Sequence, residues 1–118
     1  MAKKQIYIVD DDESVRRSLG LLLSTFGFQT QTFSSAEEFF SMVSVNDSGL
    51  LILDIHMPGL SGWTALQRIY AGIKRKVIVI TADKNGGLME RALKTGAMGF
   101  LQKPFEDNDL VNLINKVY

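Results

Sequence analysis

Short, unbroken apolar runs alternate along the chain with longer stretches in which apolar residues recur every three or four positions. Unbroken runs predict strands buried on both faces of a parallel sheet, because such strands have no polar face. These runs cover residues 6–9, 50–53 and 77–80. Residues 99–102 form a weaker strand candidate, and the more alternating residues 29–33 indicate an outer strand.

The stretches between these strands have helical periodicity, and each predicted helix presents one apolar stripe. In chain order the stripes are Val15, Leu19, Leu22, Leu23 and Phe26; Phe39, Phe40 and Val43; Ala65, Leu66, Ile69 and Tyr70; Met89, Ala92 and Leu93; and Leu110, Leu113, Ile114 and Val117. Gly27, Gly72 and Gly96 follow three of these stripes and are expected to end those helices. Residues 34–37 form a candidate capping box for the second helix.

Strands that alternate with helices predict right-handed crossovers and a parallel sheet covered on both faces. Five such units predict a flavodoxin-like α/β fold, a (βα)5 three-layer sandwich whose sheet has the order 2-1-3-4-5. The length of 118 residues corresponds to one ordinary domain. We therefore expect residues 1–118 to form a single domain.

Composition narrows the possible functions. Thirteen basic and thirteen acidic residues give a formal net charge of zero, so no global positive field attracts nucleic acid or an anionic membrane. The sequence has no cysteine, which excludes disulfides, thiolate zinc sites and a cysteine nucleophile. No apolar run approaches the ~18 residues that span a membrane, and the N-terminus has no signal-peptide core. We expect a soluble, cytoplasmic protein without a membrane partner.

Candidate chemistry follows the strands. In open α/β sheets the ligand site lies beyond the carboxyl ends of the strands, where the strand order reverses. The chain places Asp10 and Asp11 after its first strand and Asp54 after its third. Three crowded carboxylates repel one another, and a hard divalent cation such as Mg²⁺ relieves this repulsion. Thr81 and Lys103 follow the fourth and fifth strands, and a hydroxyl, an ammonium and a metal beside a carboxylate suit the transfer of a phosphoryl group.

Each of these residues also has a structural interpretation. The acids of residues 10–13 suit any helix N-terminus, and Asp12 alone can be an N-cap. Thr81 alone would more often cap a strand end, and Lys103-Pro104 alone could be a plain turn. His56 is the single histidine, and we expect it in an exposed loop without a catalytic side-chain role. The joint placement of polar residues on four strand ends favours a site.

Four segments of the chain resemble the CheY-like receiver domain of two-component response regulators. They are VDD at 9–11, DIHMPGLSG at 54–62, ITA at 80–82 and GAMGFLQKPF at 96–105. They occur in the family's order and spacing, and the resemblance covers the whole chain. FSSAEEF at 33–39 and KPF at 103–105 further resemble LuxR-type regulators of the FixJ kind.

The resemblance implies a metal site and a modified residue. Asp54 matches the phosphoacceptor of the family. Asp11 matches the acid that binds Mg²⁺ directly, and Asp10 matches the neighbouring acid that acts largely through water. The backbone carbonyl of His56 matches the third protein ligand, together with the Asp54 carboxylate.

The resemblance also implies the residues that pair with the phosphoryl group and transmit the signal. Thr81 matches the switch hydroxyl, and Ala82 matches the small residue that leaves access to the phosphoryl group. Lys103 matches the phosphate-pairing lysine, whose bond to Pro104 is expected to be cis. Phe100 occupies the position of the family's switch aromatic.

The function that the resemblance implies is bacterial signal transduction. A sensor histidine kinase would donate a phosphoryl group to Asp54, and hydrolysis would remove it, so the protein would catalyse only its own modification. Phosphorylation is expected to reshape the face made by the fourth helix and fifth strand, with homodimerisation as one outcome. DNA binding, for transcription regulation, would come only from an output domain outside this chain.

Other functions fit less well. A small phosphohydrolase of the haloacid dehalogenase type would use Asp10 as its nucleophile, but this leaves Asp54 without a role. An interaction module that has lost phosphorylation would not need the full set of acceptor residues. A dinucleotide site is not supported, because no Gly-x-Gly-x-x-Gly follows the first strand.

Overall fold

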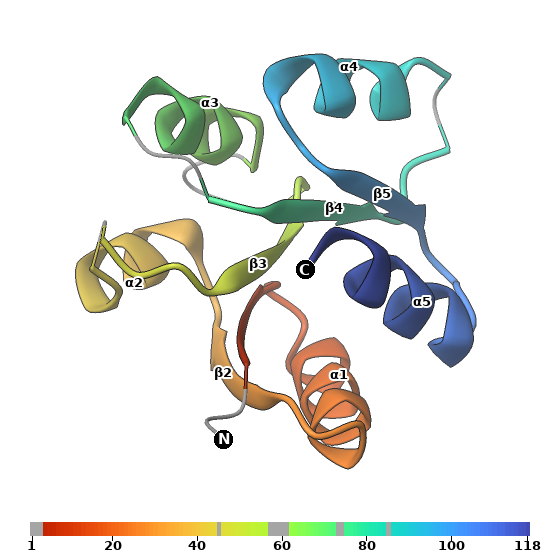
Figure 1. Ribbon diagram of the computed structural model, residues 1–118. Helices are drawn as coiled ribbons and strands as arrows, with labels where there is room; N and C mark the ends of the chain where they lie inside the picture. Colours follow the sequence, from red (N-terminus) through yellow and green to blue (C-terminus); the bar gives the residue numbers. More distant parts are fainter. Residues whose placement is uncertain (1–3, 45, 57–61, 73–74, 85) are drawn as a thin grey trace.

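Figure 1 shows the computed structural model, which describes residues 4–44, 46–56, 62–72, 75–84 and 86–118. The strands are β1 (Gln5–Val9), β2 (Gln29–Phe33), β3 (Leu50–Asp54), β4 (Val77–Thr81) and β5 (Gly99–Gln102). The helices are α1 (Glu13–Thr25), α2 (Ala36–Met42), α3 (Gly62–Gly72), α4 (Leu88–Thr95) and α5 (Asp107–Val117). Neighbouring strands pair in parallel in the order β2-β1-β3-β4-β5. The predicted flavodoxin-like fold is confirmed.

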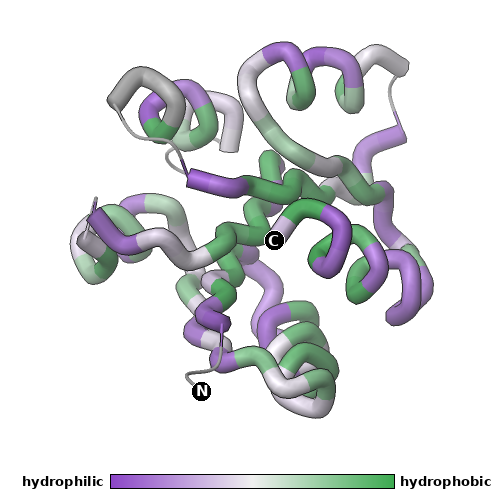
Figure 2. Tube along the Cα trace, viewed as in Figure 1, coloured by the Kyte–Doolittle hydropathy of each residue, from purple (hydrophilic) through white to green (hydrophobic). Residues whose placement is uncertain are grey.

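The sheet separates two apolar layers (Figure 1). Helices α1 and α5 cover one face, where Leu23 and Ile114 are fully buried against the strands. Helices α2, α3 and α4 cover the other face, where Phe39 and Leu66 join the core. Figure 2 shows the central strands mostly hydrophobic, whereas hydrophobic and hydrophilic positions alternate along the helices. Strands β3 and β4 are buried along their whole length, as unbroken apolar runs predict.

Strand register brings the polar strand ends together at one edge of the sheet. Asp54, the last residue of β3, pairs with Ile80 of β4, and Thr81 pairs with Gln102 of β5. Asp10 directly follows β1, and its backbone N–H donates to Phe33 O at 3.2 Å. The four carboxyl ends that carry polar residues therefore face one region.

The helix ends follow the local sequence with two differences from prediction. Asp12 is the N-cap of α1, because its carboxylate accepts from the N–H groups of Ser14 and Val15. The cap of α2 lies at Ser35, whose hydroxyl accepts from the N–H of Glu38 at 3.1 Å, so the capping pair is one residue later than the candidate box. Gly72 is the last residue of α3 rather than the residue after it.

The predicted apolar stripe of α4 is only partly covered by the core. Ala92 is fully buried, whereas Met89 is 54% exposed and Leu93 is 45% exposed. The helix contacts the core through Ala92 and the half-buried Leu88, so Met89 and Leu93, one turn apart, face outward. None of the helices within the described ranges is long and apolar enough to span a bilayer.

Candidate functional site

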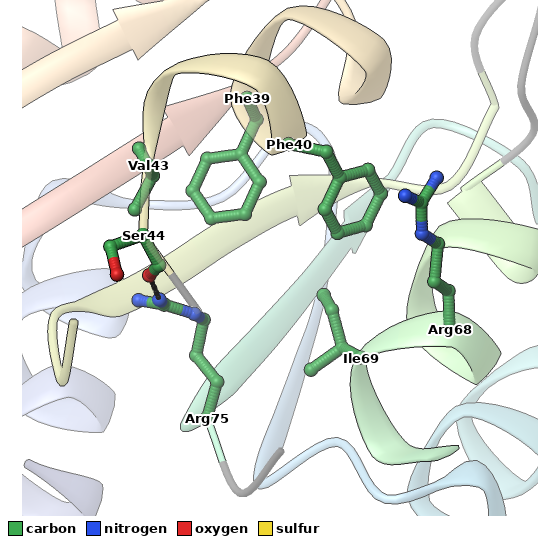
Figure 3. Close-up of a pocket in the computed structure, with 7 residues that line it drawn as sticks. All are labelled: Phe39, Phe40, Val43, Ser44, Arg68, Ile69 and Arg75. Carbon is green, nitrogen blue, oxygen red and sulfur yellow. Dashed lines mark hydrogen bonds between the residues drawn. The ribbon is translucent and has the colours of Figure 1, made fainter. Parts of the chain in front are cut away.

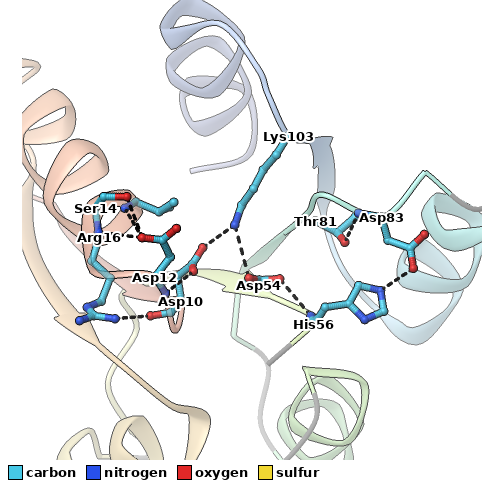
Figure 4. A network of polar contacts seen from close by, with 10 residues as sticks. Asp10, Asp12, Ser14, Arg16, Asp54, His56, Thr81, Asp83 and Lys103 are labelled. Carbon is cyan, nitrogen blue, oxygen red and sulfur yellow. Dashed lines mark hydrogen bonds and ion pairs between the residues drawn. The ribbon is translucent and has the colours of Figure 1, made fainter. Parts of the chain in front are cut away.

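Three carboxylates meet at the carboxyl edge of the sheet, as the strand ends predicted. Figure 4 shows two of them, Asp10 and Asp54. Oxygen atoms of Asp10, Asp11 and Asp54 all lie within 4.8 Å of one another. Asp10 is completely buried, Asp54 is 5% exposed and Asp11 is exposed. Two of the three charges are therefore shielded from water, and the third lies at the surface.

Asp10 is held on every side. One carboxylate oxygen accepts from the N–H of Asp12 at 2.9 Å, and the other accepts from Lys103 Nζ at 2.7 Å. Its backbone carbonyl accepts from the Arg16 guanidinium at 2.7 Å. A fully buried carboxylate needs such partners, because an unpaired buried charge is strongly destabilising.

The carboxylate of Asp54 has two partners among the described residues, and one of them, Lys103, also pairs with Asp10. Its Oδ1 accepts from the N–H of His56 at 2.9 Å, and its Oδ2 lies 3.4 Å from Lys103 Nζ. Burial raises the pKa of the Asp54 carboxyl, and the charge of Asp10 adds to this, while the His56 N–H and Lys103 act in the opposite direction. Asp54 is thus an under-compensated carboxylate with one oxygen beside an ammonium.

Lys103 directly follows the outer strand β5, and its ammonium links the two buried acids. Burial alone would lower the pKa of its ammonium, but the hydrogen bond and charge of Asp10, with Asp54 behind it, outweigh burial and raise the pKa. The lysine is therefore charged at neutral pH. Its bond to Pro104 is cis, as expected from the resemblance.

The cluster fits a hard divalent cation. Three carboxylates face one ammonium, so the site has an excess of negative charge, and all the clustered ligand atoms are oxygens. Mg²⁺ prefers oxygen ligands of this kind and keeps several waters. Residues 57–61, which complete the quoted DIHMPGLSG motif, lie outside the described residues, and the role of the His56 carbonyl stays a prediction.

Thr81 and Ala82 lie beside the acids at the end of β4 and just after it. Thr81 is completely buried, and its hydroxyl accepts from the N–H of Asp83 at 3.0 Å. Ala82 is exposed. Figure 4 shows the Thr81 hydroxyl near Asp54, on the side away from Asp10. Phe100 is half-buried on β5, pairs in register with Val79 and packs against the core below α4.

Two partners of these residues were not predicted from the sequence. The imidazole Nε2 of His56 lies 3.0 Å from the carboxylate of Asp83, so the exposed histidine bridges the loops after β3 and β4. Arg16 braces the carbonyl of Asp10 from the first turns of α1. Asp83 could have been found from the sequence, because it is an acid two residues after Thr81 at the end of a strand. Arg16 could not, because it is one of several charged residues on a helix.

Comparisons with known proteins agree with this geometry. Residues 6–115 match the family described as the response regulator receiver domain. The C4-dicarboxylate transport transcriptional regulatory protein DctR of Rhodobacter capsulatus is 38% identical over 111 residues, which are 92% of this chain and 56% of that protein. The transcriptional regulatory protein FixJ of Rhizobium meliloti is 35% identical over 118 residues, which are 98% of this chain and 57% of that protein.

A solved structure gives the same result. The crystal structure of FixJ-N superposes with a TM-score of 0.88 at 35% identity, covering 99% of this chain and 94% of that one. The chain spans about half the length of the curated relatives described above. These relatives are response regulators of the FixJ and LuxR-type kind. The chain belongs to the family of response regulator receiver domains.

Proposed function

We propose that this chain is the phosphoacceptor domain of a two-component system and that Asp54 receives the phosphoryl group in a Mg²⁺-dependent step. One observation carries the proposal. Asp54 is 5% exposed, has Lys103 Nζ 3.4 Å from one oxygen, and lies within 4.8 Å of carboxylate oxygens of Asp10 and Asp11. A phosphoryl group placed there would meet an ammonium and a cation-binding cluster.

The transfer uses the carboxylate of Asp54 as the nucleophile. An oxygen of Asp54 attacks the phosphorus of a phosphohistidine on a sensor kinase, an acyl-phosphate P–O bond forms, and the P–N bond breaks. The departing imidazole keeps the electron pair and takes a proton from water. The N–H of His56 orients one oxygen of Asp54, and Lys103 can pair with a phosphoryl oxygen. Mg²⁺ held by Asp10, Asp11 and Asp54 would supply charge neutralisation for the phosphoryl oxygens.

The surroundings favour Asp54 over Asp10 as the acceptor. Asp10 is completely buried, and both of its carboxylate oxygens already accept strong hydrogen bonds. A phosphohydrolase that uses Asp10 as its nucleophile is therefore not supported. Hydrolysis of the acyl phosphate by water regenerates the Asp54 carboxylate and releases phosphate, so the domain acts on itself rather than turning over an outside substrate. The small, exposed side chain of Ala82 would leave the phosphoryl group on Asp54 accessible to water.

Signal transmission is proposed to run through Thr81 and Phe100. A phosphoryl oxygen on Asp54 would accept a charge-assisted hydrogen bond from the Thr81 hydroxyl and draw it inward. The half-buried Phe100 on the neighbouring strand could then move further into the core. The adjoining face of α4 and β5 already exposes Met89, Leu93 and Met98, which suits a homodimer of the phosphorylated form.

The wider assignment is likewise a proposal. Residues 1–118 would form a single receiver domain that works in the cytoplasm with a sensor histidine kinase. The relatives are transcriptional regulators about twice as long as the stretch that matches, which supports control of a DNA-binding output domain. Any DNA contact would belong to that output domain, consistent with the zero formal net charge of this chain.

Intact-mass measurement tests the acceptor. Incubation with acetyl phosphate and Mg²⁺ should add one phosphoryl group, and chelation of Mg²⁺ should prevent it. Asp54→Asn should abolish the adduct, while Asp47→Asn, at the opposite edge of the sheet, should retain it. An adduct that persists in Asp54→Asn and disappears in Asp10→Asn would overturn the proposal in favour of a phosphohydrolase.

Thr81→Ala tests the transmission. This variant should still accept the phosphoryl group but should show little phosphorylation-dependent dimerisation and little change in amide exchange over residues 86–101. Analytical ultracentrifugation and hydrogen exchange measure both. Dimerisation of phosphorylated Thr81→Ala equal to that of the parent would show that the signal takes another route.

A further inference from the structure

A cavity lies between α2 and α3, toward the opposite edge of the sheet from the acidic cluster (Figure 3). Its volume is about 120 Å³. It is bounded by side chains from the end of α2, from the middle of α3 and from the segment that enters β4. None of its lining residues takes part in the site around Asp54.

The walls of this α2–α3 pocket are mainly apolar and aromatic. Phe39 and Ile69 are buried, and Phe40 and Val43 are half-buried. The rings of Phe39 and Phe40 are 5.6 Å apart at an angle of 63°, so one presents its edge to the face of the other. An apolar cavity of about 150 Å³ holds a benzene ring. A pocket of similar size with aromatic walls therefore has the dimensions and the stacking surfaces for one planar ring.

Two guanidinium groups flank these apolar walls. Arg75 is 5% exposed and is fixed by N–H donation to the carbonyls of Gly49 at 2.6 Å and Ser44 at 3.2 Å. The carboxylate of Asp47 lies 3.6 Å from it, so this charge is largely balanced within the protein. Arg75 thus forms a rigid polar wall.

Arg68 is the cation whose charge is open to a ligand. Its guanidinium lies 4.4 Å from the centre of the Phe40 ring, which holds it beside the cavity (Figure 3). It is exposed, and across the described ranges of the chain no carboxylate forms an ion pair with it. Arginine binds carboxylates in a bidentate manner while stacking on an aromatic face, so this position is suited to an anionic group on a ring.

We propose that the α2–α3 pocket binds a small aromatic carboxylate, with its ring among Phe39, Phe40 and Ile69 and its carboxylate facing Arg68. The apolar walls of the pocket match the aromatic ring of such a ligand, and the guanidinium of Arg68 at the rim matches its negative charge. A neutral ring would leave the Arg68 charge unused, and an aliphatic carboxylate would leave the aromatic walls unfilled. The bound molecule would join α2 to α3 without contacting the acidic cluster.

Amide chemical shifts of the isotope-labelled chain test this site, with benzoate as the probe, benzyl alcohol as its neutral counterpart and acetate as its aliphatic counterpart. At constant ionic strength, benzoate should produce saturable shifts confined to residues 39–44 and 68–69 and to Arg75. Benzyl alcohol should bind the same residues more weakly, and acetate should give no saturable shift there. The same titration of Asp54→Asn should match the parent, which separates this site from the proposed phosphoryl site.

Two arginine variants isolate the charge. Arg68→Met keeps the aliphatic stem and should weaken benzoate binding by about two- to fivefold, with benzyl alcohol unaffected. Arg91→Met is the matched control, because Arg91 stacks at 4.0 Å on the ring of Trp63 away from the pocket. It should leave both ligands unchanged.

A pocket-filling variant and three contrary results complete the test. Val43→Phe should remove benzoate binding while retaining the folded amide spectrum. Non-saturating benzoate shifts scattered over surface lysines would overturn the proposal. Equal affinity for benzoate and benzyl alcohol would overturn the anionic ligand class, and equal weakening by Arg68→Met and Arg91→Met would overturn the assignment to this pocket.

Discussion

Charged groups are buried both where the strands begin, which we call the amino edge, and where the strands end, the carboxyl edge. The two edges balance these charges differently. At the amino edge, Arg75 lies 3.6 Å from the carboxylate of Asp47, which also accepts from the hydroxyl of Tyr7 at 2.7 Å and the N–H of Gly49 at 2.7 Å. Burial would raise the pKa of Asp47, but the Gly49 and Tyr7 hydrogen bonds and the Arg75 charge outweigh it and lower the pKa. Within this described network, the charge of Arg75 is matched by the well-bonded carboxylate of Asp47.

The carboxyl edge has an excess of acids instead. Lys103 serves both Asp10 and Asp54, with Asp11 beside them, and the pKa of Asp54 is raised rather than lowered. We infer from this contrast that the charges at the amino edge are structural and that those at the carboxyl edge could bind a cation. At the amino edge Arg75 and Asp47 balance each other, which stabilises the fold. At the carboxyl edge the clustered carboxylates outnumber the ammonium of Lys103, which favours binding of a cation from solution.

Arg75→Met should have the largest effect on stability. The substitution leaves the carbonyls of Gly49 and Ser44 without their donor and removes the cation beside Asp47, so we expect a loss of about 3–5 kcal/mol in the free energy of unfolding. Urea denaturation measures it. Arg75→Lys, which retains the charge, should recover part of this loss. A loss below about 1 kcal/mol would show that the amino-edge network is not structural.

Lys103→Met should have the next largest effect, because it leaves two buried carboxylates close together. We expect a loss of roughly 2–3 kcal/mol in urea denaturation at pH 7 with a chelator present. The raised pKa of Asp54 sets the sign of the pH dependence: its ionised form is the unfavourable one, so the loss should shrink as the pH falls and Asp54 takes up a proton. Adding Asp54→Asn to Lys103→Met should recover part of this loss, because Asp10 then remains as the one buried carboxylate of the pair that Lys103 served. If the stability loss of Lys103→Met grew as the pH fell, repulsion between the carboxylates of Asp10 and Asp54 would not be its cause.

Tyr7 gives a smaller effect at alkaline pH. Burial, with the hydrogen bond and charge of Asp47, raises the pKa of Tyr7 to about 12. Between pH 10 and pH 12 the unfolded chain releases the phenol proton while the folded chain keeps it, so stability falls by roughly 2 kcal/mol over that range. Tyr7→Phe should lack this component of the alkaline loss, with Tyr118→Phe as the control. Parallel stability curves for the parent and Tyr7→Phe above pH 10 would contradict this.

Much of the fold was predictable because its signals are local and repeated. Unbroken apolar runs located β3 and β4, and the helical periods located the five helices within a few residues. The α4 stripe marks the limit of this signal, because periodicity shows that one face of a helix is apolar but not whether that face is covered. Met89 and Leu93 satisfy the period and still face outward.

The site was predictable in position but not in its partners. Strand ends in a parallel sheet share an edge, so the clustering of Asp10, Asp11 and Asp54 followed from topology. The pairing of Lys103 with Asp10, 93 positions apart, depends on side-chain geometry that a sequence pattern does not contain. The same limit applies to the contact of His56 with Asp83 across two loops. The α2–α3 pocket had no sequence signal, because its phenylalanines fit the core stripe of α2.

The most direct test of the contrast between the edges is the Mg²⁺ dependence of the free energy of unfolding, in the parent and in two matched variants. Mg²⁺ at about 100 times its dissociation constant should stabilise the parent by roughly 2.7 kcal/mol. Asp54→Asn should be more stable than the parent in chelator, because burial disfavours the ionised carboxylate, and it should lose most of the Mg²⁺ response. Asp47→Asn should be less stable in chelator and keep the full response. An Asp54→Asn response equal to the parent's, or loss of the response in Asp47→Asn, would contradict the assignment of the cation site to the acidic carboxyl edge.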